Sequence, residues 1–169
     1  MATLKRKNSK SIEVLAGHIR ELAGKQVKIG WFKGTVYPDG TPVSYVAAIQ
    51  EFGVPSKNIP PRPFMRPTVI REQKNWIKLL ADGARHVLKG NWSATEVLKA
   101  VGHKAKDDVT KSIDLVISPP LKPATIMARA RRRAKRVRGK PLITPSLQKP
   151  LIDTTKMISS ISYHVEDSK

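Results

Sequence analysis

Five prolines crowd one short stretch of this chain and restrict what that stretch can fold into. They fall between Pro55 and Pro67, in the segment EFGVPSKNIPPRPFMRPTV that begins at Glu51. Each proline fixes its own φ angle, removes one N–H donor and favours extended geometry in the residue before it. We therefore expect a proline-rich strap over 54–67, in which residues 57–67 are extended, pre-ordered and join no strand ladder.

A strap of this kind has two interpretations. It is either a rigid connector held against its own domain, or a surface prepared for another subunit, since a stiffened chain loses less entropy on association. In the second interpretation Phe64 and Met65 are apolar anchors for a partner, and Arg62 and Arg66 beside them pair with acidic groups of that neighbour.

Apolar periodicity ahead of the strap predicts a helix, a strand and a second, shorter helix. The first helix covers 8–24 and turns one apolar stripe toward the core. The strand runs through Val27, Ile29 and Trp31 and is half-buried. After a turn or exposed loop at YPDG, the short helix SYVAAIQEF is expected to point Phe52 inward and to end at Gly53.

Behind the strap, two longer helical patterns predict a hairpin. They cover 68–88 and 93–116, and the capping box Ser93-x-x-Glu96 opens the second. A single helical turn capped by Asp153 or Thr154 and a strand over 161–165 close the chain, and this strand is expected to pair with the strand near Val27. The predicted fold is α+β, a small antiparallel sheet flanked by helices including a long helical hairpin, with extended proline-rich and basic loops, in one domain of 1–169.

Charge singles out residues 119–150. The chain carries a net charge of +19, and ten lysines and arginines but no acidic residue lie between Asp114 and Asp153. We expect a projecting basic arm or loop that a partner orders, because like charges this dense repel one another. The partner is either nucleic-acid backbone or an acidic protein surface, and the residues expected to contact it are Arg129, Arg131, Arg132, Arg133, Lys135, Arg136 and Arg138.

Catalytic and metal-binding patterns are not found in the sequence. There is no cysteine, the four histidines are far apart, and no Walker, H-E-x-x-H or G-x-S-x-G motif occurs. Asp107 and Asp108 are adjacent on a predicted helix, so their carboxylates do not point together. We expect no enzymatic activity, no cofactor and no metal. No membrane partner is expected either, since no apolar stretch approaches the ~18 residues of a membrane span.

Four stretches in order resemble the phage tail-completion and head–tail joining proteins of the minor tail protein Z type. They are YPDGTPVSYVAAIQEFG, IPPRPFMRPTV, PPLKPATIMARARRR and KPLIDTTKMISSISYHV. In that family a helix ends in Glu-Phe-Gly ahead of Pro-x-Arg-Pro-Phe-Met, and Pro-Leu-Ile-Asp-Thr-Gly precedes a final strand. This chain has Thr155 in place of that glycine, and a β-branched residue makes a left-handed turn less easily.

The resemblance implies a virion structural protein that completes the tail and joins it to the head connector. It implies a homo-oligomeric ring around the DNA path, for which we expect six subunits, with tail tube and head connector or completion proteins as neighbours and the genomic DNA backbone within reach. The chain would be made in the host cytoplasm and end in the virion, at the head–tail junction or tail end. The alternative is a free nucleic-acid-binding protein that uses the basic segment 129–140.

Overall fold

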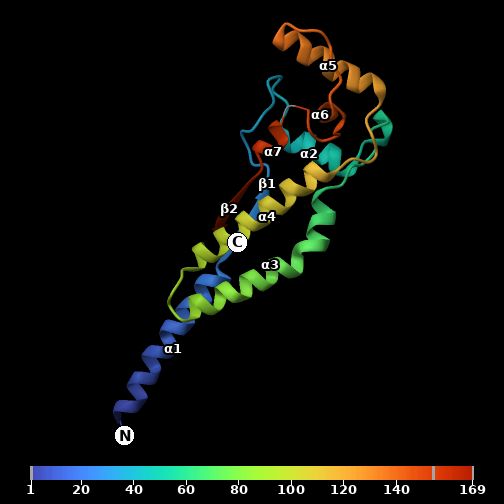
Figure 1. Ribbon diagram of the computed structural model, residues 1–169. Helices are drawn as coiled ribbons and strands as arrows, with labels where there is room; N and C mark the ends of the chain where they lie inside the picture. The colour runs from blue at the N-terminus through green and yellow to red at the C-terminus, as the bar shows by residue number, and fades with distance from the viewer. Residues whose placement is uncertain (1, 154, 169) are drawn as a thin grey trace. The chain divides into compact units, whose positions relative to one another are not determined.

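Helices dominate the described part of the chain, and two short strands complete it (Figure 1). This computed structural model describes residues 2–153 and 155–168, with side chains described from Ile12 onward. The elements are α1 (Ala2–Ala23), β1 (Lys25–Gly30), α2 (Val43–Phe52), the 3-10 turn η1 (Pro55–Lys57), α3 (Met65–Leu88), α4 (Ala94–Leu115), α5 (Pro123–Val137), α6 (Pro145–Gln148), α7 (Lys156–Ser159) and β2 (Ser162–Asp167).

The elements gather into two compact units. Unit 1 contains Met1–Ile29, Glu72–Lys106 and Tyr163–Lys169, and unit 2 contains Gly30–Arg71 and Asp107–Ser162. Neither unit is a continuous stretch of sequence, because both helices of the hairpin and both strands run from one unit into the other. The expected single domain of 1–169 stays a prediction.

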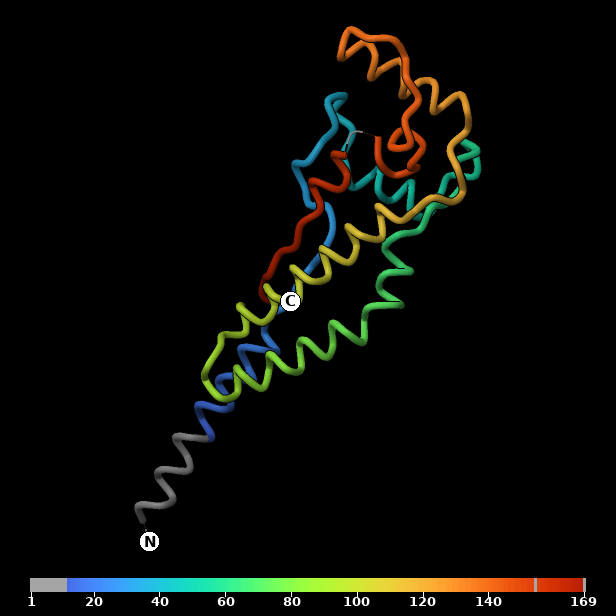
Figure 2. Tube along the Cα trace, viewed as in Figure 1, coloured from blue at the N-terminus to red at the C-terminus, as the bar shows by residue number. Residues whose placement is uncertain are grey.

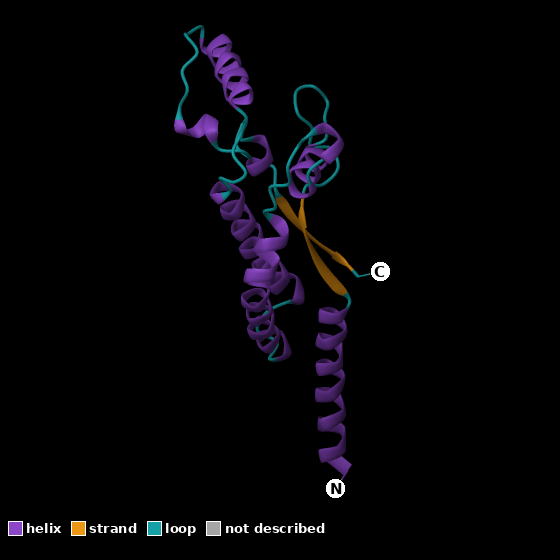
Figure 3. Cartoon of the chain, turned by 90° about the vertical axis from the view of Figure 1, so that its right-hand side faces the viewer, coloured by secondary structure: helices purple, strands orange, loops and turns teal. Residues whose placement is uncertain are grey.

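The two strands pair antiparallel, as the sequence predicts, and with the helices they confirm the α+β class (Figure 3). The Lys25 ammonium lies 3.1 Å from Asp167, and the Ser168 amide donates to the Gly24 carbonyl at 2.8 Å. These contacts place Lys25 opposite Asp167, with opposite charges facing across the strands. Cross-strand pairs of this kind support the register of a short sheet.

In unit 1, small residues let α4 approach the sheet and α3 closely. A Cβ added to Gly102 of α4 would lie 2.5 Å from the Tyr163 ring and 2.9 Å from the Val27 side chain. A Cβ added to Gly83 of α3 would lie 2.4 Å from a methyl group of Val97 in α4. The predicted helical hairpin is confirmed, and Figure 2 traces α3 through its turn into α4.

Helix α4 begins as the capping box predicts. The Ser93 amide donates to the Glu96 carboxylate at 2.8 Å, and the Glu96 amide donates to the Ser93 hydroxyl at 3.2 Å. The Ala94 amide finds its acceptor in the carboxylate of Glu21, at the end of α1. The unpaired amides at this helix start are therefore shared between local and distant oxygens.

Helix α1 differs from its prediction. It extends to Ala2, well ahead of residue 8, and its apolar stripe is not core-facing in the described structure. Ile12 is 64% exposed, and Leu15 and Ile19 are exposed too. The 3.6-residue period places these side chains on one face but says nothing of whether another element covers that face. None of the described helices has the length and apolar character that crossing a membrane requires.

Unit 2 is built around the aromatic pair Trp31 and Phe64. Their rings meet edge to face at 5.7 Å, and the Trp31 indole N–H donates to the Met157 carbonyl at 2.8 Å. The YPDG stretch forms the expected tight loop, closed by a bridge between Val36 and Pro42. Phe52 was expected to point inward, but its side chain is 63% exposed, because α2 buries the face that carries Glu51 instead.

Candidate functional site around the strap and the basic helix

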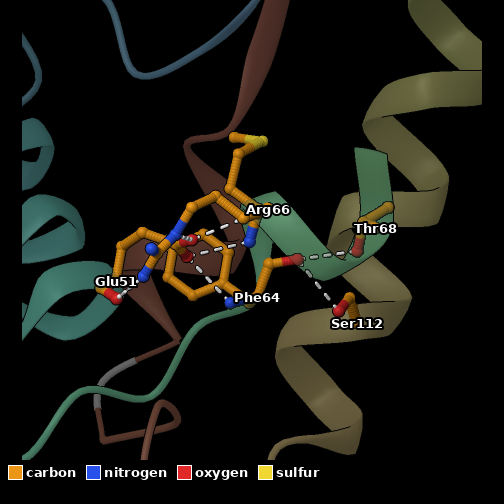
Figure 4. A network of polar contacts seen from close by, with 6 residues as sticks. Glu51, Phe64, Arg66, Thr68 and Ser112 are labelled. Atoms are coloured by element: carbon orange, nitrogen blue, oxygen red, sulfur yellow. Dashed lines mark hydrogen bonds and ion pairs between the residues drawn. The ribbon is translucent and has the colours of Figure 1, made fainter. Parts of the chain in front are cut away.

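The carboxylate of Glu51 joins α2 to the strap and to the start of α3 (Figure 4). It accepts hydrogen bonds from the backbone amides of Phe64 at 2.8 Å, Met65 at 2.9 Å and Arg66 at 3.1 Å. The Arg66 guanidinium adds a fourth, at 3.0 Å. These amides are among the donors that the start of a helix leaves without partners, where the helix dipole also favours a negative charge. One buried side chain therefore supplies the cap that α3 lacks locally.

Two opposing effects act on the pKa of Glu51. Burial of the carboxyl group raises the pKa, but the amides of Met65, Phe64 and Arg66 and the Arg66 guanidinium together outweigh burial and hold the pKa below its ordinary value. Glu51 is therefore ionised at neutral pH, although its side chain is nearly inaccessible to water.

The strap is held against unit 2 by Arg62 and Gly53. The Arg62 guanidinium donates to the carbonyls of Pro119 at 2.8 Å and Pro120 at 3.2 Å, and its amide donates to the Gln50 carbonyl at 2.7 Å. Gly53 has φ +72°, and a Cβ there would lie 2.7 Å from the Pro61 nitrogen, so only glycine fits where EFG meets the strap.

Two predicted partner-binding residues are internal instead. Phe64 is 1% exposed and Arg62 5% exposed. The Phe64 carbonyl accepts from the hydroxyls of Thr68 at 2.7 Å and Ser112 at 3.1 Å. Side chains this buried offer a neighbour no surface, so the described structure assigns both to the packing of unit 2. The expected extended strap is only partly correct: 55–57 form η1, Val54 and Ile59 pair in an isolated bridge, and 65–67 are helical. Helix α3 begins at Met65 and not at 68 because proline is tolerated in the first turn of a helix.

Met65 and Arg66 stay nearer the surface. Met65 is half-buried, and Arg66 is exposed and bound to Glu51. The Arg66 guanidinium also lies 4.9 Å from the centre of the exposed Phe52 ring. The expected contact of Met65 and Arg66 with a partner stays a prediction. The exposed Phe52 ring lies beside Arg66 on the same surface.

Arg129 was expected in a projecting basic arm, and this expectation is wrong for Arg129 itself. The residue is 7% exposed, and its guanidinium donates to the carbonyls of Leu147 at 3.2 Å, Lys149 at 2.7 Å and Pro150 at 2.9 Å. The carboxylate of Asp153 lies 3.6 Å away. Burial lowers the pKa of Arg129, and Asp153 partly offsets that effect. Arg129 therefore ties α5 to the segment that follows α6.

The other six predicted contact residues of the basic segment are exposed and form two rows. At 3.6 residues per turn, Arg132, Arg133 and Arg136 share one flank of α5, which we call the inner row. The outer row consists of Arg131 and Lys135 on the opposite flank and of Arg138, the left-handed residue that ends α5. Each row therefore has three positive charges.

The inner row faces a cleft of about 440 Å³, which we call the arginine cleft. The cleft is also lined by the exposed Val137, the half-buried Ile152, the buried Leu147 and the carboxylate of Asp153. The Arg132 guanidinium lies 2.7 Å from that carboxylate. A second cavity of about 270 Å³ adjoins the first and shares Arg132 and Asp153 with it.

Thr155 adopts a left-handed backbone conformation, which is costly for a β-branched residue. Its φ is +58°, where the resembling family has glycine, and Thr154 before it lies outside the described residues. We expect Thr155→Gly to raise the free energy of unfolding by about 0.5–1 kcal/mol, because relief of a left-handed β-branched residue exceeds the added entropy of the unfolded chain.

Urea unfolding of both proteins measures this effect. Asn58 is a matched control, because it is also left-handed, with φ +53°, but asparagine tolerates this region. Asn58→Gly should change stability much less. Equal effects of the two substitutions would contradict the explanation.

Sequence reasoning missed the roles of Glu51, Arg129 and Asp153. Glu51 and Asp153 were visible as charged residues inside the otherwise apolar motifs AAIQEF and PLID, and a charge in such a place is retained only where it is paired. No signal in the sequence distinguishes Arg129 from the basic residues around it. Over the described residues, no three histidine, aspartate or glutamate side chains gather as metal ligands. Comparisons of the chain with family models, curated proteins and solved structures find no match.

Proposed function

We propose that this chain is a structural protein of a phage virion that completes the tail and joins it to the head connector, as a homo-oligomeric ring for which six subunits are expected. Its neighbours in the particle are the tail tube and head connector proteins. The chain performs no catalysis in this role and acts by presenting fixed surfaces.

The observation that supports this proposal is how the motifs of the resemblance meet. EFG contacts PRPFMRP through Glu51, PRPFMRP contacts PPL through Arg62, and ARARRR contacts KPLID through Arg129. All three contacts lie within unit 2. Motifs spread over a hundred residues therefore act as one structural assembly, which is what a shared structural role would require of them. A set of chance matches would have no reason to interlock.

The test is made on particles. Phage induced from the source of this gene should contain the chain after purification, and a stop codon early in the gene should leave filled heads and tails that do not join. Electron microscopy shows the defect, and supplying the wild-type chain in trans should restore joined particles. Absence of the chain from purified particles, or normal joining without it, would overturn the proposal.

A second candidate is a free nucleic-acid-binding protein. The exposed outer and inner rows of α5 favour it, since exposed arginines bind phosphate and release counterions. Size-exclusion chromatography of the pure chain with and without duplex DNA separates the candidates. A stable DNA complex of isolated subunits that dissociates with rising salt would favour this second function. Elution of the chain apart from DNA would exclude it.

A further inference from the structure

The arginine cleft combines positive charge with an apolar wall. Arg132, Arg133 and Arg136 line it together with the exposed Val137 and the half-buried Ile152. Among contacts of the described residues, Arg136 has no ion pair, and Arg133 reaches only the Thr144 hydroxyl at 3.5 Å. Two of the four arginines that line the cleft, Arg133 and Arg136, therefore have charges that no carboxylate of the described chain neutralises.

Asp153 shows which chemistry the cleft accepts. Its carboxylate lies 2.7 Å from the Arg132 guanidinium, the distance of a charge-assisted hydrogen bond. It is the one acidic side chain among those that line the cleft. The cleft thus already holds one carboxylate beside an apolar wall, and it has arginines for more.

Shape and charge favour a peptide over DNA as the occupant. The cavity of about 440 Å³ suits a few extended residues, whereas duplex DNA lies against open surfaces and presents one charge per ~1.7 Å of its axis. A phosphate backbone gains nothing from Val137 and Ile152. An acidic peptide with apolar side chains uses both parts of the lining, because its carboxylates bind the arginines and its apolar groups contact the apolar residues.

We propose that the arginine cleft binds an acidic segment of a partner protein, whose carboxylates pair with Arg132, Arg133 and Arg136 and whose apolar side chains contact Val137 and Ile152. Asp153 competes with the incoming carboxylate for Arg132. The inference names the class of partner for the basic helix. It rests on the proposed function in one respect, namely that a virion protein supplies the acidic segment.

Fluorescence anisotropy on the full chain tests the proposal at physiological ionic strength. The probe is a short labelled peptide in which glutamate and leucine alternate, and a peptide with glutamine in place of glutamate is its control. The inner-row variant Arg132→Gln/Arg133→Gln/Arg136→Gln should weaken binding of the acidic peptide by about tenfold, since each exposed ion pair changes an equilibrium a few-fold at most.

The outer-row variant Arg131→Gln/Lys135→Gln/Arg138→Gln is the matched control, because it removes an equal number of exposed positive charges from α5 and the residue that ends it. It should weaken peptide binding less than about threefold. Asp153→Asn should strengthen binding by about threefold, because Arg132 loses its internal partner. A residue with a purely structural role would not raise affinity when it is removed.

Four results would overturn the proposal. They are equal losses from the two triple variants, equal binding of the glutamate and glutamine peptides, weaker binding by Asp153→Asn, and labelled duplex DNA as the only probe that binds. Circular dichroism checks folding first. If a triple variant unfolds, the pair Arg136→Gln and Lys135→Gln replaces it, since neither residue has an ion pair among the described contacts.

These outcomes are independent of the test in particles. Peptide binding is measured on the isolated chain, so its failure would leave the virion role standing. Absence of the chain from virions would leave the peptide site standing.

Discussion

Glu51→Gln is expected to lower the free energy of unfolding of unit 2 by about 3 kcal/mol. The amide that replaces the carboxylate presents two N–H donors to the amides of Phe64, Met65 and Arg66, so part of this buried set loses its acceptor. The Arg66 guanidinium loses its ion pair at the same time. Removing one partner from a buried, charge-assisted network costs ~3–5 kcal/mol. Glutamine retains part of the hydrogen bonding, so the expected loss lies at the lower end of this range.

Trp31 reports this change without interference from unit 1. Its ring contacts Phe64, whereas Trp76 and Trp92 lie in unit 1. Urea unfolding followed by fluorescence, in a chain carrying Trp76→Phe and Trp92→Phe, therefore measures unit 2. The control is Asp114→Asn, which removes an exposed carboxylate of unit 2 that pairs with Lys149 and should have a much smaller effect. Equal losses from both substitutions would contradict the cap that we assign to Glu51.

The difference in stability between wild type and Glu51→Gln is expected to depend on pH. The pKa of Glu51 is lower in the folded chain than in the unfolded chain. Its contribution to the free energy of unfolding is therefore complete above the unfolded pKa of about 4.3. The contribution is lost as pH falls from there through the folded pKa. The difference in stability between wild type and Glu51→Gln should therefore be constant from about pH 5 to 7 and shrink below about pH 4.3. A difference that does not change with acidification would show that Glu51 is not ionised in the folded chain.

Arg129→Lys is expected to lower the free energy of unfolding of unit 2 by about 3 kcal/mol although it preserves the charge. The planar guanidinium reaches the carbonyls of Leu147, Lys149 and Pro150 together, and an ammonium group cannot reproduce that fork. Buried carbonyls left without a donor cost ~1–3 kcal/mol each. Urea unfolding with Trp31 as the reporter measures the loss, and hydrogen exchange should show lower protection over 145–153.

Arg131→Lys is the control for this substitution. It makes the same chemical change two positions along α5, at an exposed residue, and should alter stability by less than about 0.5 kcal/mol. If Arg129→Lys were equally mild, the carbonyl contacts of Arg129 would not stabilise the segment after α6, and a projecting arm would again describe this part of the chain.

Local signals in the sequence predicted much of the fold. The hairpin of α3 and α4 follows from apolar period and turn residues, and the alternation of each strand is local although β1 and β2 pair across 142 residues. The groups of the capping box at Ser93 lie within a few residues of one another. Such interactions depend on chain neighbours and are readable without coordinates.

The sequence by itself determined that 54–67 is stiff and that 119–150 is basic, because proline geometry and formal charge belong to the residues themselves. Only the tertiary structure decided which of their side chains face water. Arg129 became internal because the carbonyls of the 147–153 loop required a donor there, and Phe64 became internal because its ring packs against Trp31 while Glu51 binds its amide. A polar group buried without such a partner is too costly, and the partner's position is set by the fold and not by distance along the chain.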